Sequence, residues 1–160
     1  MSELIRCYVV VAPENTFGLR VNTLASFCLG NQQIHRIFQS LTDLPIEALV
    51  AQNSEIKSNQ VTSTTVGDQA VIMEKTSITS TIVGANCVVN PKVRISNSIL
   101  MDNVIVGENV TIENCIICEK SDIKSGSILR NCLIGSNYVV SVNSKKENQH
   151  LSHSEGFMEI

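Results

Sequence analysis

The feature that most constrains this chain is an aliphatic repeat between Val66 and Val140. A register that steps six, six and five residues in turn always meets Val, Ile or Leu, and each cycle takes 17 residues. The positions on this register are Val66, Ile72, Ile78, Val83, Val89, Ile95, Leu100, Val106, Ile112, Ile117, Ile123, Leu129, Ile134 and Val140. A fixed short period of this kind is typical of stacked structural units.

A step of five or six residues matches the hexapeptide class of repeats, in which one short strand and one turn form each side of a prism. Three sides close one coil, and successive coils stack as parallel strands roughly 4.8 Å apart. The aliphatic side chains then point inward and form continuous columns. The sequence therefore predicts a mainly β fold, with a parallel β-helix of 17-residue coils over residues 66–140.

Two further positions of each coil agree with this prediction. The position two residues before each aliphatic residue lies near a corner and requires a small side chain, and one such column contains Thr81, Ser98, Cys115 and Cys132. A second column contains Ala70, Cys87, Val104 and Ser121, with Tyr138 at its end. The third position of the shortened side contains Ser80, Asn97, Asn114 and Asn131. Because Asn tolerates a left-handed backbone, we expect these residues to adopt it and to bond to their copies one coil away.

The N-terminal part of the chain has a different pattern. Residues 4–12 are rich in β-branched residues and predict a strand, whereas apolar residues at roughly helical spacing over residues 19–41 predict one helix or two. A lone strand requires a neighbouring strand for its hydrogen bonds. Residues 1–41 are therefore expected to be the remnant of a larger domain.

The segments that flank the repeat are polar. Residues 42–65 predict a linker with a degenerate first coil on Val50, Ile56 and Val61. After residue 140 the register would next fall on Lys146, so residues 141–160 are expected to form a polar tail. A stack of parallel strands has an open edge at each end, and we expect the helix and the tail to cover these edges.

Composition excludes several classes of function. The net charge is −3 and the Lys and Arg residues are scattered along the sequence, so we expect protein partners rather than direct nucleic-acid or membrane binding. The chain has six cysteines and its first 12 residues lack the apolar run of a signal peptide or membrane span. These features indicate a reducing, cytosolic compartment.

No catalytic, metal or cofactor site is predicted. Hexapeptide acyltransferases and zinc-dependent carbonic anhydrases use histidines that project from the coils, but His35, His150 and His153 all lie outside the repeat. Cys118 has no neighbour in the pattern that would activate its thiol. The stacked cysteines of the small-residue column are interpreted as buried side chains rather than as a disulfide.

One outer face of the predicted β-helix carries no charge over four coils. This face is built on Val83, Leu100, Ile117 and Ile134. It consists of the residues directly before and after each of them: Ile82, Gly84, Ile99, Met101, Ile116, Cys118, Leu133 and Gly135. An apolar patch on the order of a few hundred Å² is more than a soluble monomer usually leaves uncovered. We therefore predict a protein interface at Ile82, Ile99, Met101, Ile116 and Leu133. The alternative is that the outer surface of a β-helix is simply apolar.

Several segments, in their order along the chain, resemble the gamma-subunit family of eukaryotic translation initiation factor two-B. They are residues 5–9, 20–24, 131–135 and 158–160, together with the hexapeptide coils. The resemblance implies a left-handed β-helix preceded by a pyrophosphorylase-like α/β domain. Residues 1–41 would then be the last strand and helix of that domain, the rest of which is absent from this chain.

The resemblance also implies a function. The chain would be a non-catalytic scaffold or regulatory subunit of a cytosolic guanine nucleotide exchange factor that acts on initiation factor two. It would pair with the epsilon subunit, which carries the exchange-catalysing domain, and assemble with the other subunits. No cofactor is implied. The alternative is a hexapeptide acyltransferase-like enzyme with an unrecognised site.

Overall fold

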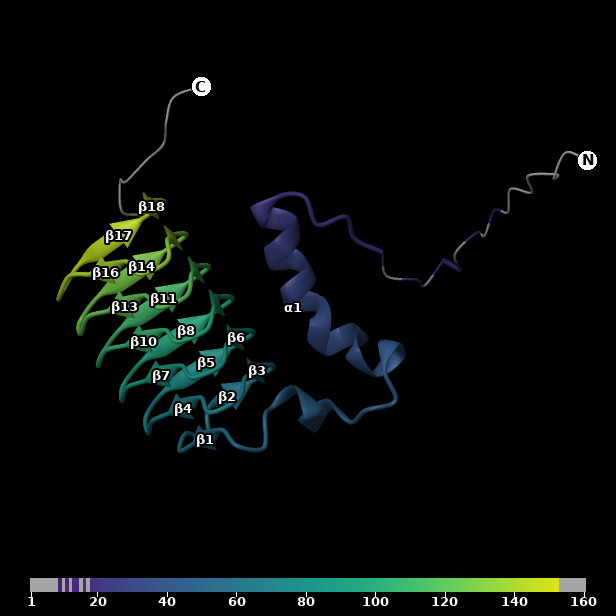
Figure 1. Ribbon diagram of the computed structural model, residues 1–160, viewed down its shortest axis with the longest axis horizontal. Helices are drawn as coiled ribbons and strands as arrows, with labels where there is room; N and C mark the ends of the chain where they lie inside the picture. Colours follow the sequence, from purple (N-terminus) through teal and green to yellow (C-terminus); the bar gives the residue numbers. More distant parts are fainter. Residues whose placement is uncertain (1–8, 10, 12, 15, 17, 153–160) are drawn as a thin grey trace, which may run out of the picture.

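The computed structural model describes residues 9, 11, 13, 14, 16 and 18–152, without the side chains of residues 35, 36 and 39–41. Helix α1 (Leu24–Leu41) is followed by the short 3-10 helix η1 (Ile46–Leu49) and then by a tall parallel β-helix (Figure 1). The predicted strand at residues 4–12 lies outside the described residues except for Val9 and Val11, which are not in a strand.

The β-helix has three sides, and each side is a six-stranded parallel sheet with one strand from each coil. Sheet 1 contains β1 (Glu55–Ile56), β4 (Val71–Ile72), β7 (Val88–Val89), β10 (Ile105–Val106), β13 (Asp122–Ile123) and β16 (Val139–Val140). Sheet 2 contains β2 (Val61–Thr62), β5 (Ser77–Thr79), β8 (Arg94–Ser96), β11 (Thr111–Glu113), β14 (Ile128–Arg130) and β17 (Lys145–Glu147). Sheet 3 contains β3 (Thr65–Val66), β6 (Ile82–Val83), β9 (Ile99–Leu100), β12 (Ile116–Ile117), β15 (Leu133–Ile134) and β18 (His150–Leu151).

The strands pair with the 17-residue offset that the aliphatic register predicts. In sheet 2, for example, Ile112 pairs with Ile95 on one side and with Leu129 on the other. Every aliphatic register position from Val66 to Val140 is at most 2% exposed, and together they form one core. Burial of each such side chain contributes roughly 1.5–3 kcal/mol. The predicted fold class is therefore confirmed.

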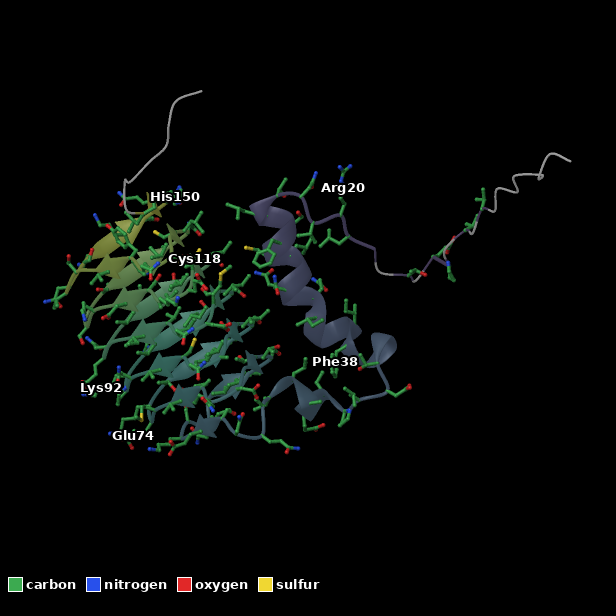
Figure 2. The ribbon with its side chains drawn as sticks, in the orientation of Figure 1. Arg20, Phe38, Glu74, Lys92, Cys118 and His150 are labelled. Carbon is green, nitrogen blue, oxygen red and sulfur yellow. The ribbon has the colours of Figure 1, made fainter. Side chains whose placement is uncertain are left out.

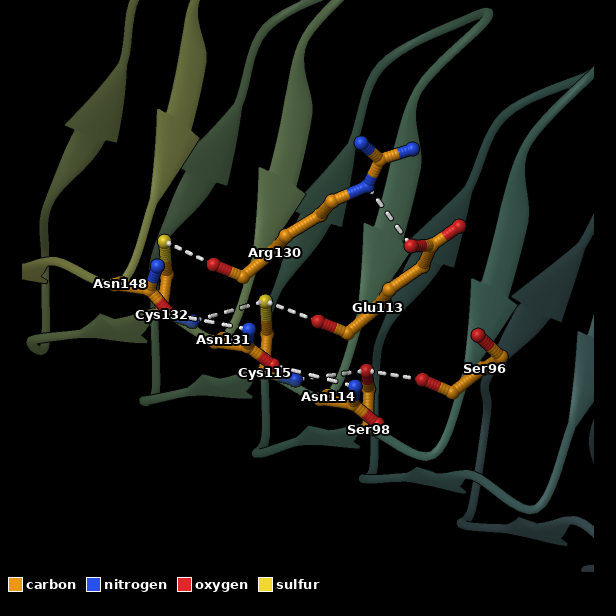
Figure 3. Close-up of polar contacts among 9 residues, drawn as sticks. All are labelled: Ser96, Ser98, Glu113, Asn114, Cys115, Arg130, Asn131, Cys132 and Asn148. Atoms are coloured by element: carbon orange, nitrogen blue, oxygen red, sulfur yellow. Dashed lines mark hydrogen bonds and ion pairs between the residues drawn. The ribbon is translucent and has the colours of Figure 1, made fainter.

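The expected asparagine ladder is present where sheet 2 meets sheet 3. Asn97, Asn114 and Asn131 have φ angles of 49°, 53° and 51°, in the left-handed region. The amide of Asn114 donates to Oδ1 of Asn131 at 3.2 Å, and the amide of Asn131 donates to Oδ1 of Asn148 at 3.1 Å (Figure 3). The backbone bends tightly here because Asn accepts this conformation at low cost.

The two ends of the β-helix differ from each other. At the first coil, η1 buries Leu49, and Val50 forms a bridge with Val66, so the polar segment 42–65 does contain a first coil. At the other end, β17 pairs with β14 and places Lys146 opposite Leu129. The β-helix therefore continues beyond Val140: its aliphatic register is interrupted at Lys146 and resumes at Leu151, which pairs with Ile134 and packs against the core.

Helix α1 begins with a capping box. The Thr23 hydroxyl accepts a hydrogen bond from the Ser26 N–H at 3.1 Å, and the Ser26 hydroxyl accepts one from the Thr23 N–H at 3.0 Å. The helix is continuous through Gly30, where a Cβ atom would lie only 3.2 Å from a methyl group of Leu19. The helix therefore begins at Leu24, and residues 19–23 precede it.

Helix α1 lies alongside sheet 3 (Figure 1). The expectation that it covers an end of the stack is therefore wrong.

Candidate protein interface

The structure gathers the residues of the predicted interface on one face. Ile82, Ile99, Ile116 and Leu133 are paired in succession across β6, β9, β12 and β15 of sheet 3. All of them point away from the core, since the next residue of each strand is the inward one. Met101 follows directly after β9. No charged residue stands at these positions, so the face is continuously apolar over four coils.

Helix α1 lies against this face. Phe27, Cys28 and Asn31 of the helix line small spaces together with Ile82 and Ile99 of sheet 3. Ile99, which lines these spaces, is only 7% exposed, and so is Ile116 on the next strand, although both side chains point outward from the β-helix. At outward positions of sheet 1, Ile105 and Val139 are 45% and 51% exposed. The expectation that Ile99 and Ile116 form an open surface is therefore wrong.

The sequence contained a signal for this packing. The helix has an apolar face of its own, and an amphipathic helix buries that face against another element. The charge-free face of sheet 3 is the matching surface. The absence of charge over four coils predicts a covered face, and the helix accounts for part of that cover.

The helix does not close the face completely. A groove of about 290 Å³ remains between Phe27 of the helix and Met101 of the β-helix, and Asp102 and Glu119 also line it. Its floor includes Gly84, where a Cβ atom would lie 2.7 Å from the carbonyl carbon of Met101. Only glycine permits this approach of the neighbouring coil. The groove thus combines apolar walls with two carboxylates.

The column of cysteines at the corner between sheets 2 and 3 is structural. Cys115 Sγ donates to the carbonyl of Glu113 at 3.2 Å and accepts from the Cys132 N–H at 3.4 Å, while Cys132 Sγ donates to the carbonyl of Arg130 at 3.1 Å (Figure 3). Both cysteines are buried and free. Burial raises the pKa of the Cys115 thiol to about 11. These thiols therefore act as small hydrogen-bonding side chains, as interpreted from the sequence.

The remaining candidate side chains are Cys118 and the three histidines. Burial, and then the charge of Glu119, raise the pKa of the half-buried Cys118 thiol, which lowers its reactivity. His35 is in α1 and His150 in β18, whereas His153 lies outside the described residues. Within the described part of the chain, no three His, Cys, Asp or Glu residues are placed to hold a metal ion. The same residues include no helix that is long and apolar enough to cross a membrane.

Three similar solved structures are named as acetyltransferases or an acetyltransferase domain. A Bacillus cereus protein named as an acetyltransferase is 22% identical, with a TM-score of 0.36, and the match covers 61% of this chain and 67% of that one. The perosamine N-acetyltransferase of Caulobacter crescentus is 11% identical, with a TM-score of 0.30 and coverage of 76% and 70%. The acetyltransferase domain of PglB from Neisseria gonorrhoeae is 15% identical, with a TM-score of 0.27 and coverage of 74% and 64%. At these identities and TM-scores the likeness says nothing about the activity of this chain.

The family assignment comes from the sequence. No curated protein matches the chain. A family model described as the EIF2B subunit epsilon LbH domain, a left-handed β-helix, matches residues 47–145. This range contains five complete coils of the observed β-helix and covers more than half of the chain. The chain therefore belongs to the EIF2B-type left-handed β-helix domain family.

Proposed function

We propose that this chain is a non-catalytic scaffold subunit of an EIF2B-type exchange factor in the cytosol, and that it is of the gamma type. The family model supports the EIF2B context. The gamma assignment is supported by the resemblance at residues 5–9, 20–24, 131–135 and 158–160. In this role the chain pairs with the epsilon subunit and presents initiation factor two to the exchange domain of epsilon.

The observation that carries this proposal is the composite surface formed by α1 and sheet 3. The helix covers the centre of the charge-free face, and the partner reaches the parts that remain: the groove at Met101 and the half-buried Leu133. Leu24 and Leu29 on the helix are exposed as well. An epsilon segment with an apolar side chain and a neighbouring cation complements the groove, because Asp102 and Glu119 line it.

Co-purification of the full chain with the epsilon subunit tests this interface. The double variant M101K/L133K places two desolvated lysines in the contact, and apolar contacts at an interface centre commonly contribute over ~1 kcal/mol each. We expect at least a tenfold loss of captured epsilon subunit. Circular dichroism should show an unchanged fold, because neither side chain belongs to the core.

The matched control is I105K/V139K on sheet 1. These changes add the same charge at exposed aliphatic positions and should leave capture unchanged. If M101K/L133K captures epsilon as well as the parent while I105K/V139K does not, the partner binds sheet 1. The acyltransferase alternative requires a different readout, turnover of an acyl donor by the purified chain, and measurable transfer would favour it.

A further inference from the structure

A groove with three cationic side chains lies on the opposite side of the β-helix from α1. It runs along the corner between sheets 1 and 2, has a volume of about 440 Å³, and is lined by Lys75, Lys92 and Arg94. In a three-sided prism this corner is opposite sheet 3, and Figure 2 shows Lys92 on the side away from the helix. This groove is therefore separate from the surface assigned to the protein partner.

The fold brings these cations together although they are scattered in the sequence. Lys75 and Lys92 occupy the same turn position in successive coils, with φ angles of 58° and 62°. Arg94 is paired in register between Ser77 and Thr111 on sheet 2. Successive coils are roughly 4.8 Å apart, so the groove presents two parallel rows of side chains over three coils.

The backbone does not account for the two lysines. Their turn position requires a left-handed conformation, and the next coils place Asn109, Gly126 and Asn143 there, which are the residue types that adopt it at least cost. Lysine has no such preference. The turn conformation therefore gives no reason for two successive lysines at this corner.

The charges of the groove are not neutralised within the described part of the chain. The ion pairs found there involve Lys57, Lys124 and Arg130, all outside the groove. Glu74 and Glu108 belong to the same corner turns but do not line it. Two like charges one coil apart repel each other, and a bound anion removes this repulsion.

We propose that this groove binds a small ligand with two or more adjacent phosphate groups. Arg and Lys side chains, together with the hydroxyls of Ser77 and Thr111 and the amide of Asn109, donate hydrogen bonds that phosphate oxygens accept. The donors extend over two coil steps, roughly 10 Å, which is more than one phosphate group spans.

Two observations favour a small ligand over nucleic acid. The lining contains no aromatic side chain on which a base could stack. The chain also has a net charge of −3, which opposes the approach of a long polyanion. The proposal does not depend on the function proposed above.

Titration of the full chain with sodium triphosphate, followed by calorimetry and by amide NMR, tests the proposal. Binding should shift the amide resonances of Ser77, Asn109 and Thr111. The variant K75N/K92N removes both charges and introduces the residue found in the next coil, so it should fold like the parent. We expect at least a tenfold loss of affinity for each cation removed.

The control variant K57N/K124N makes the same change in net charge on sheet 1 and should bind triphosphate like the parent. Absence of binding, or equal weakening in both double variants, would overturn the proposal. Orthophosphate binding as tightly as triphosphate would refute the requirement for two phosphate groups. Equal binding of an acidic peptide without phosphate, with the same sensitivity to K75N/K92N, would instead assign the groove to a protein segment.

Discussion

At the scale of single residues, the corners of the β-helix depend on the left-handed backbone conformation. Fifteen non-glycine residues of the described chain have positive φ angles, and most of those from Asn86 onward are asparagines. For most L-residues this conformation costs roughly 1–2 kcal/mol, whereas Asn and Gly adopt it readily. The amide ladder adds side-chain hydrogen bonds at the corner between sheets 2 and 3. Conformational preference and ladder bonding are thus separable by mutation.

Asn131 provides this separation. N131A loses both the favourable φ preference and two ladder contacts, to Asn114 and Asn148, and should lower the free energy of unfolding by about 1–2 kcal/mol. N131G keeps the φ preference and loses only the ladder, which is exposed to solvent, so it should be less destabilising. Urea unfolding of the two variants measures this difference. If glycine destabilises as much as alanine, the ladder rather than the backbone explains the asparagines.

At the scale of elements, the apolar face of sheet 3 serves first as the packing surface for α1. Ile99 is an outward residue of sheet 3 that also lines the contact with α1, and Ile116 beside it is equally buried. A change at these positions therefore acts first on the packing of α1 and only indirectly on a partner. The β-helix does not depend on this contact for its own core, which lies inside the prism.

The double variant I99K/I116K should release α1 from sheet 3. Two lysine ammonium groups cannot stay buried without partners, which costs several kcal/mol in the docked state. Amide hydrogen exchange should become fast in α1 and stay slow at inward positions such as Leu100 and Ile112. The matched variant E113A/R130A, which removes an exposed ion pair on sheet 2, should leave exchange in α1 unchanged. Retained protection of α1 in I99K/I116K would show that the helix is held by other contacts.

At the scale of the whole molecule, the period of the repeat made the β-helix predictable. Each inward position repeats every 17 residues, so the sequence determines the register, the core and the left-handed corners without any knowledge of long-range contacts. The position of α1 could not be read in this way, because helix periodicity shows which face is apolar but not which surface receives it. The cations at Lys75, Lys92 and Arg94 appeared scattered for a related reason: their proximity exists only once the coils are stacked.

The last coil was missed because it departs from the aliphatic register for a physical reason. The final strands of a β-helix leave backbone groups unpaired, and a charged residue at such an edge opposes pairing with another molecule. Lys146 takes the inward position opposite Leu129, at the cost of a weaker core in that coil. We expect this arrangement to lower the stability of the last described coil and to oppose association with another molecule.

The variant K146L tests this exchange between stability and association. Leucine would continue the column of Leu129 and bury further apolar surface, so we expect the free energy of unfolding to rise by about 1 kcal/mol. The same change removes a charge from the exposed edge, and we expect more self-association at high protein concentration. Urea unfolding at low concentration and sedimentation velocity over a concentration series measure the two effects separately. As a control, K145L on the outward position of β17 removes the same charge without extending the core, and should not raise stability. A K146L chain that is less stable than the parent would show that Lys146 contributes to the last coil through its own contacts, and that the edge is not protected at the expense of the core.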